Sequence, residues 1–197
     1  TPLKKICSRA AILIAATLLA ALPVRAAEVW IDVSKAADRK IALALPPLAA
    51  NEGADETTLR QTLENDLNVT GYFRLLPHDG PLLAQAARER GTAQPDHAAW
   101  SAFGAELLLR AETVRQGGQL VLRATLIDVG ARTSLLSREE SDAPTEAPRL
   151  AHRLADAVVR ALTGGPSLAL TRIAATWSHG ANLKRVVIMD YDGRNQR

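Results

Sequence analysis

The side chains best suited to bind a metal or to move a proton are the four histidines of this sequence, His78, His97, His152 and His179. A zinc site needs several histidine, cysteine or carboxylate ligands at short, regular spacings. None of the four has another histidine at position i+4 or a cysteine near it. We therefore expect solvated or packing roles for all four, and the sequence predicts no metal and no cofactor.

Neighbouring carboxylates could act as an acid–base pair, and Glu64 with Asp66 and Glu139 with Glu140 lie close in the sequence. On a helix or strand such pairs usually lie on a solvated face, which is what we expect for both. The segment Asp190-Tyr191-Asp192-Gly193 is similar to the start of a calcium-binding loop. It lacks the next acidic ligand and the distal glutamate of such a loop, so we predict a turn.

Nucleophilic catalysis is not indicated by any motif. The sequence contains no Gly-x-Ser-x-Gly elbow, no glycine loop of the phosphate-binding type and no helical His-Glu-x-x-His motif. Its single cysteine, Cys7, lies in a segment that we expect to be removed. The sequence therefore predicts a protein that is not an enzyme.

The first 26 residues have the pattern of a signal peptide. A basic start with Lys4, Lys5 and Arg9 precedes an uncharged apolar run over residues 10–22, and small residues end the segment at Ala26. The alternative, a membrane anchor, is disfavoured because this run is too short for a helix that spans a bilayer. We expect cleavage after Ala26 and export.

Removal of this segment changes the formal charge from +3 to about −1, because four of the 24 basic residues and none of the 21 acidic residues lie in it. The remaining part has no basic run, so we do not expect a nucleic-acid-binding face. It also has no cysteine, which excludes disulfides and thiolate ligands there. Its stability must come from an ordinary hydrophobic core.

Periodic patterns predict an α/β domain over residues 27–165. Leucine or valine recurs every four residues over 59–67 and 150–162, which predicts two amphipathic helices, the first with Asp55 as its N-cap. Gly117-Gly118 separates two apolar runs and is typical of a β-hairpin. The predicted order is β-β-α-β-α-β-β-β-α, a mixed sheet with flanking helices. Strands are expected at 28–33, 40–45, 72–76, 105–116, 119–129 and 132–141, and the three helices at 55–70, 95–103 and 147–162, with a weaker helical piece within 80–90.

Residues 166–197 have a different character. Two strand-like runs, 167–175 and 183–189, are joined by a short loop and followed by the predicted turn, an arrangement similar to the opening of a repeat. A lone hairpin is only marginally stable. Because the sequence starts at Thr1 and ends on a polar tail at Arg197, we interpret it as a fragment whose last strands have neighbours downstream.

The predicted first strand, Glu28–Val33, is the segment with the clearest potential for binding. Apolar residues alternate in it with Trp30 and Asp32, which is the period of a strand. A strand at a free N-terminus can join its own sheet, or it can pair with another protein. Trp30 could face the sheet or anchor a partner, and both possibilities remain open, whereas Trp100 is expected in the core.

The order of several short segments resembles the TolB family of the Tol–Pal envelope system. A Glu-Val-x-Ile-type strand starts the mature part, a second apolar strand runs into Pro46-Pro47, and a helix leads into Gly71-Tyr72-Phe73. The most specific segments are Trp100-Ser101-Ala102-Phe103-Gly104-Ala105, Thr171-Arg172-Ile173-Ala174 and Asp190-Tyr191-Asp192-Gly193-Arg194-Asn195-Gln196. Each is weak alone, and their order along the whole chain carries the resemblance.

The resemblance implies a fold and a function. Proteins of this family have an N-terminal α/β domain followed by a six-bladed β-propeller, so residues 166–197 would be a linker and the start of a truncated first blade. They are non-enzymatic periplasmic adaptors that couple TolA of the inner-membrane complex to the outer-membrane lipoprotein Pal. They serve outer-membrane integrity and constriction during cell division.

The resemblance also implies where the partners bind. Pal binds the propeller, and the C-terminal domain of TolA binds the extreme N-terminus. By position, the TolA-binding segment is Glu28, Val29, Trp30, Ile31, Asp32 and Val33. Trp30 differs from the smaller or basic residue that the family leads us to expect there.

Two other classes of function compete with the adaptor interpretation. A periplasmic binding module for a small ligand or a peptidoglycan fragment would need polar side chains that converge at one loop end of the sheet. An envelope hydrolase would need a nucleophile and a base. The sequence shows neither the polar cluster nor the catalytic set, so we prefer the adaptor.

Overall fold

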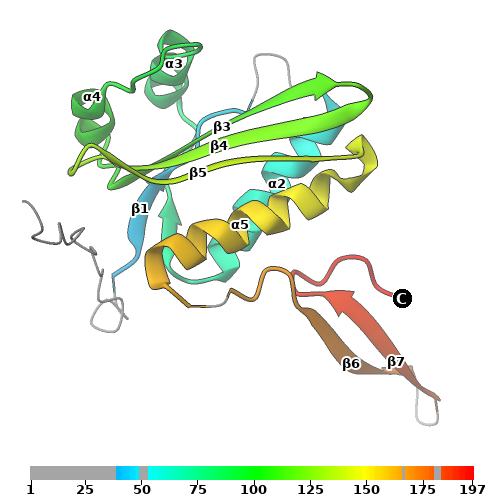
Figure 1. The fold of residues 1–197 in the computed structure, drawn as a ribbon. Coiled ribbons are helices and arrows are strands. Elements are labelled where there is room, and N and C mark those ends of the chain that lie inside the picture. Colours follow the sequence, from blue (N-terminus) through cyan, green and yellow to red (C-terminus); the bar gives the residue numbers. More distant parts are fainter. Residues whose placement is uncertain (1–38, 49–52, 166, 180–182) are drawn as a thin grey trace, which may run out of the picture. The chain divides into compact units, whose positions relative to one another are not determined.

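The computed structural model describes residues 39–48, 53–165, 167–179 and 183–197. The predicted signal peptide and the predicted strand Glu28–Val33 lie outside these residues. The described part forms an α/β domain followed by a C-terminal β-hairpin (Figure 1). Among its helices, none combines the length and the apolar character that a bilayer crossing requires.

A five-stranded mixed sheet forms the centre of the domain. Its strands are β1 (Ile41–Ala44), β2 (Phe73–Leu75), β3 (Leu107–Gln116), β4 (Gln119–Asp128) and β5 (Thr133–Asp142). The order across the sheet is β2-β1-β3-β4-β5. β1 is parallel to β2 and to β3, whereas β4 is antiparallel to β3 and to β5. The predicted α/β class with a mixed sheet is confirmed.

Helices cover both faces of this sheet. The helices are α2 (Ala54–Val69), α3 (Gly80–Arg88), α4 (His97–Ala102) and α5 (Ala147–Thr163), with a short 3-10 helix, η2 (Pro144–Glu146), before α5. α2 and α5 lie side by side on one face, and α3 and α4 lie on the other (Figure 1). All four helices fall where the sequence predicts helical segments.

The larger hydrophobic core lies between the sheet and the α2–α5 pair. Leu59, Leu63 and Leu67 of α2 are fully buried, together with the apolar stripe of α5 over residues 150–162. Complete burial of one leucine contributes about 1.5–3 kcal/mol, so these stripes supply much of the free energy that holds both helices on the sheet. On the opposite face Trp100, only 1% exposed, occupies the second core, which confirms its predicted place.

Two details of the predicted secondary structure are wrong. The N-cap of α2 is Gly53 rather than Asp55. Asp55 lies in the first turn instead, where its carboxylate accepts a hydrogen bond from Arg115 Nη2 at 2.6 Å and suits the positive end of the helix. The strand predicted over 167–175 begins only at Arg172, because residues before it form a turn in which the Thr171 N–H donates to the Leu168 carbonyl at 2.9 Å.

The predicted hairpin at Gly117-Gly118 is confirmed, since these residues join β3 to β4. Both have positive φ angles, +59° and +80°, which only glycine adopts without steric cost. We expect Gly118→Ala to lower the free energy of unfolding by about 1 kcal/mol. Urea denaturation measures this, with Gly80→Ala as the control, because Gly80 has no neighbour within 4 Å and no positive φ. An equal loss in both variants would contradict the assignment.

The C-terminal hairpin consists of β6 (Arg172–His179) and β7 (Leu183–Asp190), paired antiparallel. The following residues form the predicted turn, in which the Gly193 N–H donates to the Asp190 carbonyl at 2.8 Å. Arg194 Nη1 then donates to Thr62 Oγ1 of α2 at 2.8 Å. The turn after β7 therefore contacts α2 of the α/β domain.

Candidate functional site

The predicted partner-binding segment, Glu28–Val33, lies outside the described residues, and the structure shows where the chain enters the domain after it. Arg39 donates a hydrogen bond from Nη2 to Glu106 Oε2 at 2.6 Å. Glu106 Oε1 in turn accepts the backbone N–H of Ala42 at 3.1 Å. The Glu106 carboxylate therefore binds both Arg39, which precedes β1, and the backbone of β1.

The described sheet ends in two outer strands, where a further strand could pair. The outer strand β2 has three residues, and the outer strand β5 has ten. Polar contacts connect β5 to its neighbour β4. Arg123 Nε of β4 donates to Glu139 Oε2 of β5 at 2.7 Å, and both side chains are exposed. β5 is therefore the longer free edge among the described strands.

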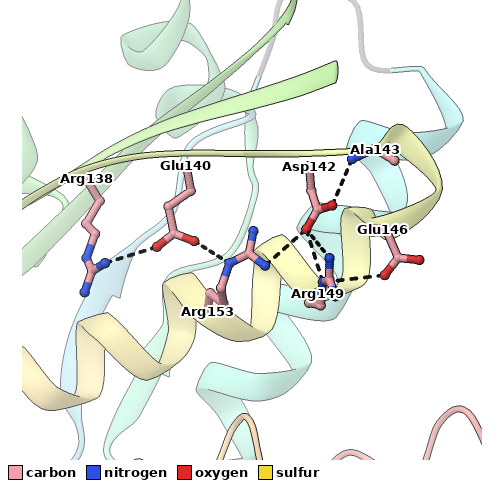
Figure 2. A network of polar contacts seen from close by, with 7 residues as sticks. All are labelled: Arg138, Glu140, Asp142, Ala143, Glu146, Arg149 and Arg153. Atoms are coloured by element: carbon pink, nitrogen blue, oxygen red, sulfur yellow. Dashed lines mark hydrogen bonds and ion pairs between the residues drawn. The ribbon is translucent and has the colours of Figure 1, made fainter. Parts of the chain in front are cut away.

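A row of ion pairs connects β5 to α5, as Figure 2 shows. Arg153 of α5 lies between two carboxylates of β5, donating to Glu140 Oε2 and, at 3.1 Å, to Asp142 Oδ2. Arg149 donates to the same Asp142 oxygen from Nε at 3.1 Å and from Nη2 at 2.8 Å. Arg138 donates to Glu140 Oε1 at 3.3 Å. These contacts fix the helix along the strand and leave no carboxylate free for acid–base chemistry here.

The hydrogen bond from Arg149 lowers the pKa of Asp142 below its ordinary value of 3.8, and Arg153 and the Ala143 N–H act in the same direction. A lowered pKa in the folded state means that the stabilisation is full above the unfolded pKa and is lost as the pH falls through the folded pKa. We expect Asp142→Asn to lower the free energy of unfolding by about 1 kcal/mol at pH 7. The difference from the wild type should shrink below about pH 4.

Urea denaturation from pH 7 to pH 3 checks this expectation. Glu146→Gln is a matched control, because the Glu146 carboxylate lies 3.6 Å from Arg149 Nε and its side chain is half exposed. A loss in Asp142→Asn that is the same at pH 7 and pH 3 would argue against an electrostatic cause.

An open cleft of about 570 Å3 lies beside β3 and β4, and a small ligand could bind there. Arg110 and Glu112 of β3 and Arg123 of β4 line it. Arg110 Nη2 already donates to the carbonyls of Thr92 at 2.8 Å and Glu89 at 3.3 Å. The polar lining is thus largely engaged within the protein.

Glu89, at the end of α3, is a buried carboxylate that sequence reasoning did not select. It is only 7% exposed. Its Oε1 accepts from Gln85 Nε2 at 2.6 Å and from the Asp96 N–H at 2.8 Å, and its Oε2 accepts from Trp100 Nε1 at 2.9 Å. One side chain therefore joins α3, the start of α4 and the second core.

Asp66 contradicts the prediction of a solvated carboxylate, because it is 0% exposed. Residues 64 and 66 lie about 200° apart around a helix, so they point to different sides. Glu64 points outward and pairs with Arg60 and His78, whereas Asp66 Oδ2 lies 2.6 Å from Nδ1 of His152 on α5. His152 is 6% exposed, so its role is a buried polar contact rather than a solvated one.

Asp192, in the turn after β7, brings a second carboxylate to this pair. One ligand atom from each of Asp66, His152 and Asp192 lies within 4.8 Å of the other two. Burial raises the pKa of Asp66 above its ordinary 3.8, although the hydrogen bond to His152 opposes this. Burial by itself lowers the pKa of His152, but Asp66, Asp192 and Asp190 outweigh it and raise the pKa above 6.5.

The other histidines match the prediction as far as they are described. His78 is partly exposed and lies 3.2 Å from Glu64 Oε1. His97 begins α4, and the side chain of His179 lies outside the described part. Sequence patterns did not predict the cluster of Asp66, His152 and Asp192, because its members come from three elements and share no local spacing. Asp66 and His152 are 86 positions apart.

Comparison with known proteins agrees with this fold. Residues 29–135 match the TolB amino-terminal domain. A Tol-Pal system protein TolB from Jannaschia sp. (strain CCS1) is 32% identical over 172 residues, 84% of this chain and 38% of that protein. One from Myxococcus xanthus (strain DK1622) is 33% identical over 191 residues, 95% of this chain and 44% of that protein. The chain therefore spans less than half the length of either relative.

A solved structure shows the same fold. The crystal structure of TolB from Acinetobacter baumannii is similar with a TM-score of 0.66 and 23% sequence identity, over 81% of this chain and 38% of that one. Both relatives above are named as a Tol-Pal system protein and not as an enzyme, in agreement with the prediction. Since the family match covers more than half of its residues, this chain belongs to the TolB family.

Proposed function

We propose that this chain is the N-terminal part of a non-enzymatic periplasmic adaptor of the Tol–Pal system, which couples TolA to the lipoprotein Pal. The observation that carries the proposal is the family match over residues 29–135. The predicted signal peptide supports a periplasmic location. The absence of a catalytic motif in the sequence is consistent with a role in protein–protein contacts.

We assign TolA binding to Glu28–Val33. Support comes from its period-2 pattern and from its position before the α/β domain, whose described residues form a five-stranded sheet with helices and two cores. A strand of six residues that adds to a sheet edge gains a few hydrogen bonds worth about 0.5–1.5 kcal/mol each, against an ordering cost of about 1–2 kcal/mol per residue. Binding should therefore be modest, and any docking of the strand on its own protein should compete with it.

We assign the β6–β7 hairpin to the first blade of a β-propeller that continues beyond this sequence and binds Pal. Exposed apolar side chains support this: Ile173 is 44% exposed, Trp177 56% and Val186 69%. Apolar residues at such exposure on a two-stranded hairpin indicate a surface that further strands cover.

Titration calorimetry of the TolA C-terminal domain into two versions of the chain, one starting at Ala27 and one at Lys35, tests the role of the terminal strand. We expect binding only by the longer version. Equal binding by both would move the TolA site into the α/β domain. Absence of binding by both would refute the TolA assignment and leave the propeller as the functional surface.

The cleft beside β3 and β4 favours one second candidate, a site for a small ligand or a peptidoglycan fragment. Such a ligand would raise the melting temperature, because binding to the folded state alone stabilises it by RT ln(1 + [L]/Kd). Arg110→Ala should remove that rise, because this guanidinium lines the cleft. A screen of muropeptides without any shift would dismiss this candidate and leave the adaptor role untouched.

A further inference from the structure

We propose that Asp66, His152 and Asp192 form a binding site for one divalent transition-metal cation of the zinc class. The site would connect α2, α5 and the turn after β7. All three proposed ligands belong to this chain, so the inference does not depend on TolA or Pal binding.

The first argument is that unpaired polar atoms gather at this place. Among the described residues, six buried side-chain polar atoms have no hydrogen-bond partner. Three of these six are Asp66 Oδ1, His152 Nε2 and Asp192 Oδ2. The Asp66 and Asp192 side chains are 0% exposed and the His152 side chain 7%. A buried polar atom without a hydrogen bond costs about 1–3 kcal/mol, so three such atoms in one cluster point to a ligand that binds there.

The second argument is the charge of the cluster. The carboxylates of Asp66 and Asp192 lie close to the His152 imidazole. Arg194 Nε lies 3.5 Å from Asp192 Oδ2 without forming a hydrogen bond. Arg194 Nη1 is already engaged with Thr62. The neighbouring Asp190 carboxylate accepts from Asn195 Nδ2 at 2.5 Å and lies 3.7 Å from Arg172 Nε, which offsets its charge. A divalent cation would compensate the excess.

The third argument is the type and spacing of the ligand atoms. One imidazole nitrogen and two carboxylate oxygens suit Zn²⁺, Mn²⁺ or Fe²⁺ rather than Ca²⁺, which prefers oxygen ligands alone. The three atoms lie within 4.8 Å of one another. Two ligands of Zn²⁺, each about 2.0–2.2 Å from the metal, are about 3.4 Å apart in a tetrahedron, so side-chain movements of about 1 Å close the site. Solvent or a backbone carbonyl would complete the coordination.

The proposed cation would act as a clamp. Asp66 and His152 belong to the helix pair of the α/β domain, and Asp192 belongs to the turn that leads out of the C-terminal hairpin. Without a metal, the turn contacts the domain through the Arg194–Thr62 hydrogen bond, through Tyr191, which packs against the larger core, and through the cluster itself. Metal binding would therefore restrain how the hairpin is attached to the domain.

The experiment uses the full chain with Cys7→Ser, so that the single thiol does not compete for the metal. Zn²⁺ alone is the probe, in calorimetry and in thermal denaturation. We expect one equivalent to bind and the melting temperature to rise. His152→Gln and Asp192→Asn should each weaken binding at least about 10-fold. His78→Gln, which removes an imidazole that pairs with Glu64, is the matched control and should bind like the parent.

Co²⁺ provides a readout that needs no variant, because its visible absorption reports coordination by nitrogen and oxygen in the parent chain itself. Circular dichroism verifies that each variant is folded. Equal Zn²⁺ affinity in parent and folded variants would overturn the proposal. So would the absence of both saturable Zn²⁺ binding and a Co²⁺ spectrum in the parent, which would leave a hydrogen-bonded histidine–aspartate pair without a metal.

Discussion

Glu89→Gln is expected to lower the free energy of unfolding by about 2–3 kcal/mol. The Glu89 carboxylate accepts three hydrogen bonds, from Gln85, the Asp96 backbone and Trp100, at distances of 2.6–2.9 Å. An amide of the same shape has one accepting oxygen and an NH2 group that can only donate. In either orientation of the amide, at least one buried donor then faces another donor, and that clash is the source of the loss.

Two control variants separate this cause from a general effect of removing a charge. Glu139→Gln removes an equally charged but exposed carboxylate that pairs with Arg123, and it should change stability by less than about 0.5 kcal/mol. Trp100→Phe removes the indole donor and keeps most of the apolar volume. Combined with Glu89→Gln, it should cost less than the sum of the two single losses, because one clash disappears. Additive losses in urea denaturation would contradict the shared hydrogen bond.

Some parts of this fold can be predicted from the sequence and others cannot. The stripes over 59–67 and 150–162 predict α2 and α5, and Gly117-Gly118 predicts the β3–β4 hairpin, because each signal is local in the sequence. Strand order is not local. β1 pairs with β2 and β3, and that arrangement depends on which helices cover which face of the sheet.

The polar clusters are less predictable still. Trp100 is expected in the core from its size and neighbours, but its partner Glu89 carries no pattern that distinguishes it from a solvated glutamate. From the sequence, Asp66 is assigned to the acidic face of a helix. Only the packing of α2 against α5 places its carboxylate next to His152. Isolated polar residues become partners through tertiary packing, which period and spacing do not encode.

The largest functional effect is expected for Ile31→Pro, which should weaken binding of the TolA C-terminal domain at least about 100-fold. Ile31 is central in the predicted strand Glu28–Val33. Proline removes the backbone N–H and fixes φ near −65°, so it both deletes a ladder hydrogen bond and distorts its neighbours. A combined loss of about 3 kcal/mol corresponds to a factor of about 100 in the dissociation constant. Calorimetric titration measures it.

Ala36→Pro is the matched control, since it places the same residue in the predicted polar connection after the strand, where no ladder bond is expected. Both variants should keep the cooperative melt of the wild type, because the described part of the chain, from β1 to α5, supplies two hydrophobic cores. Loss of that melt in Ile31→Pro would mean that the strand belongs to the sheet of its own domain. Equal weakening by both prolines would mean that the flexibility of the whole segment, and not a strand, is what TolA requires. A selective loss at Ile31 with an unchanged melt is the combination that only a terminal strand offered to a partner produces.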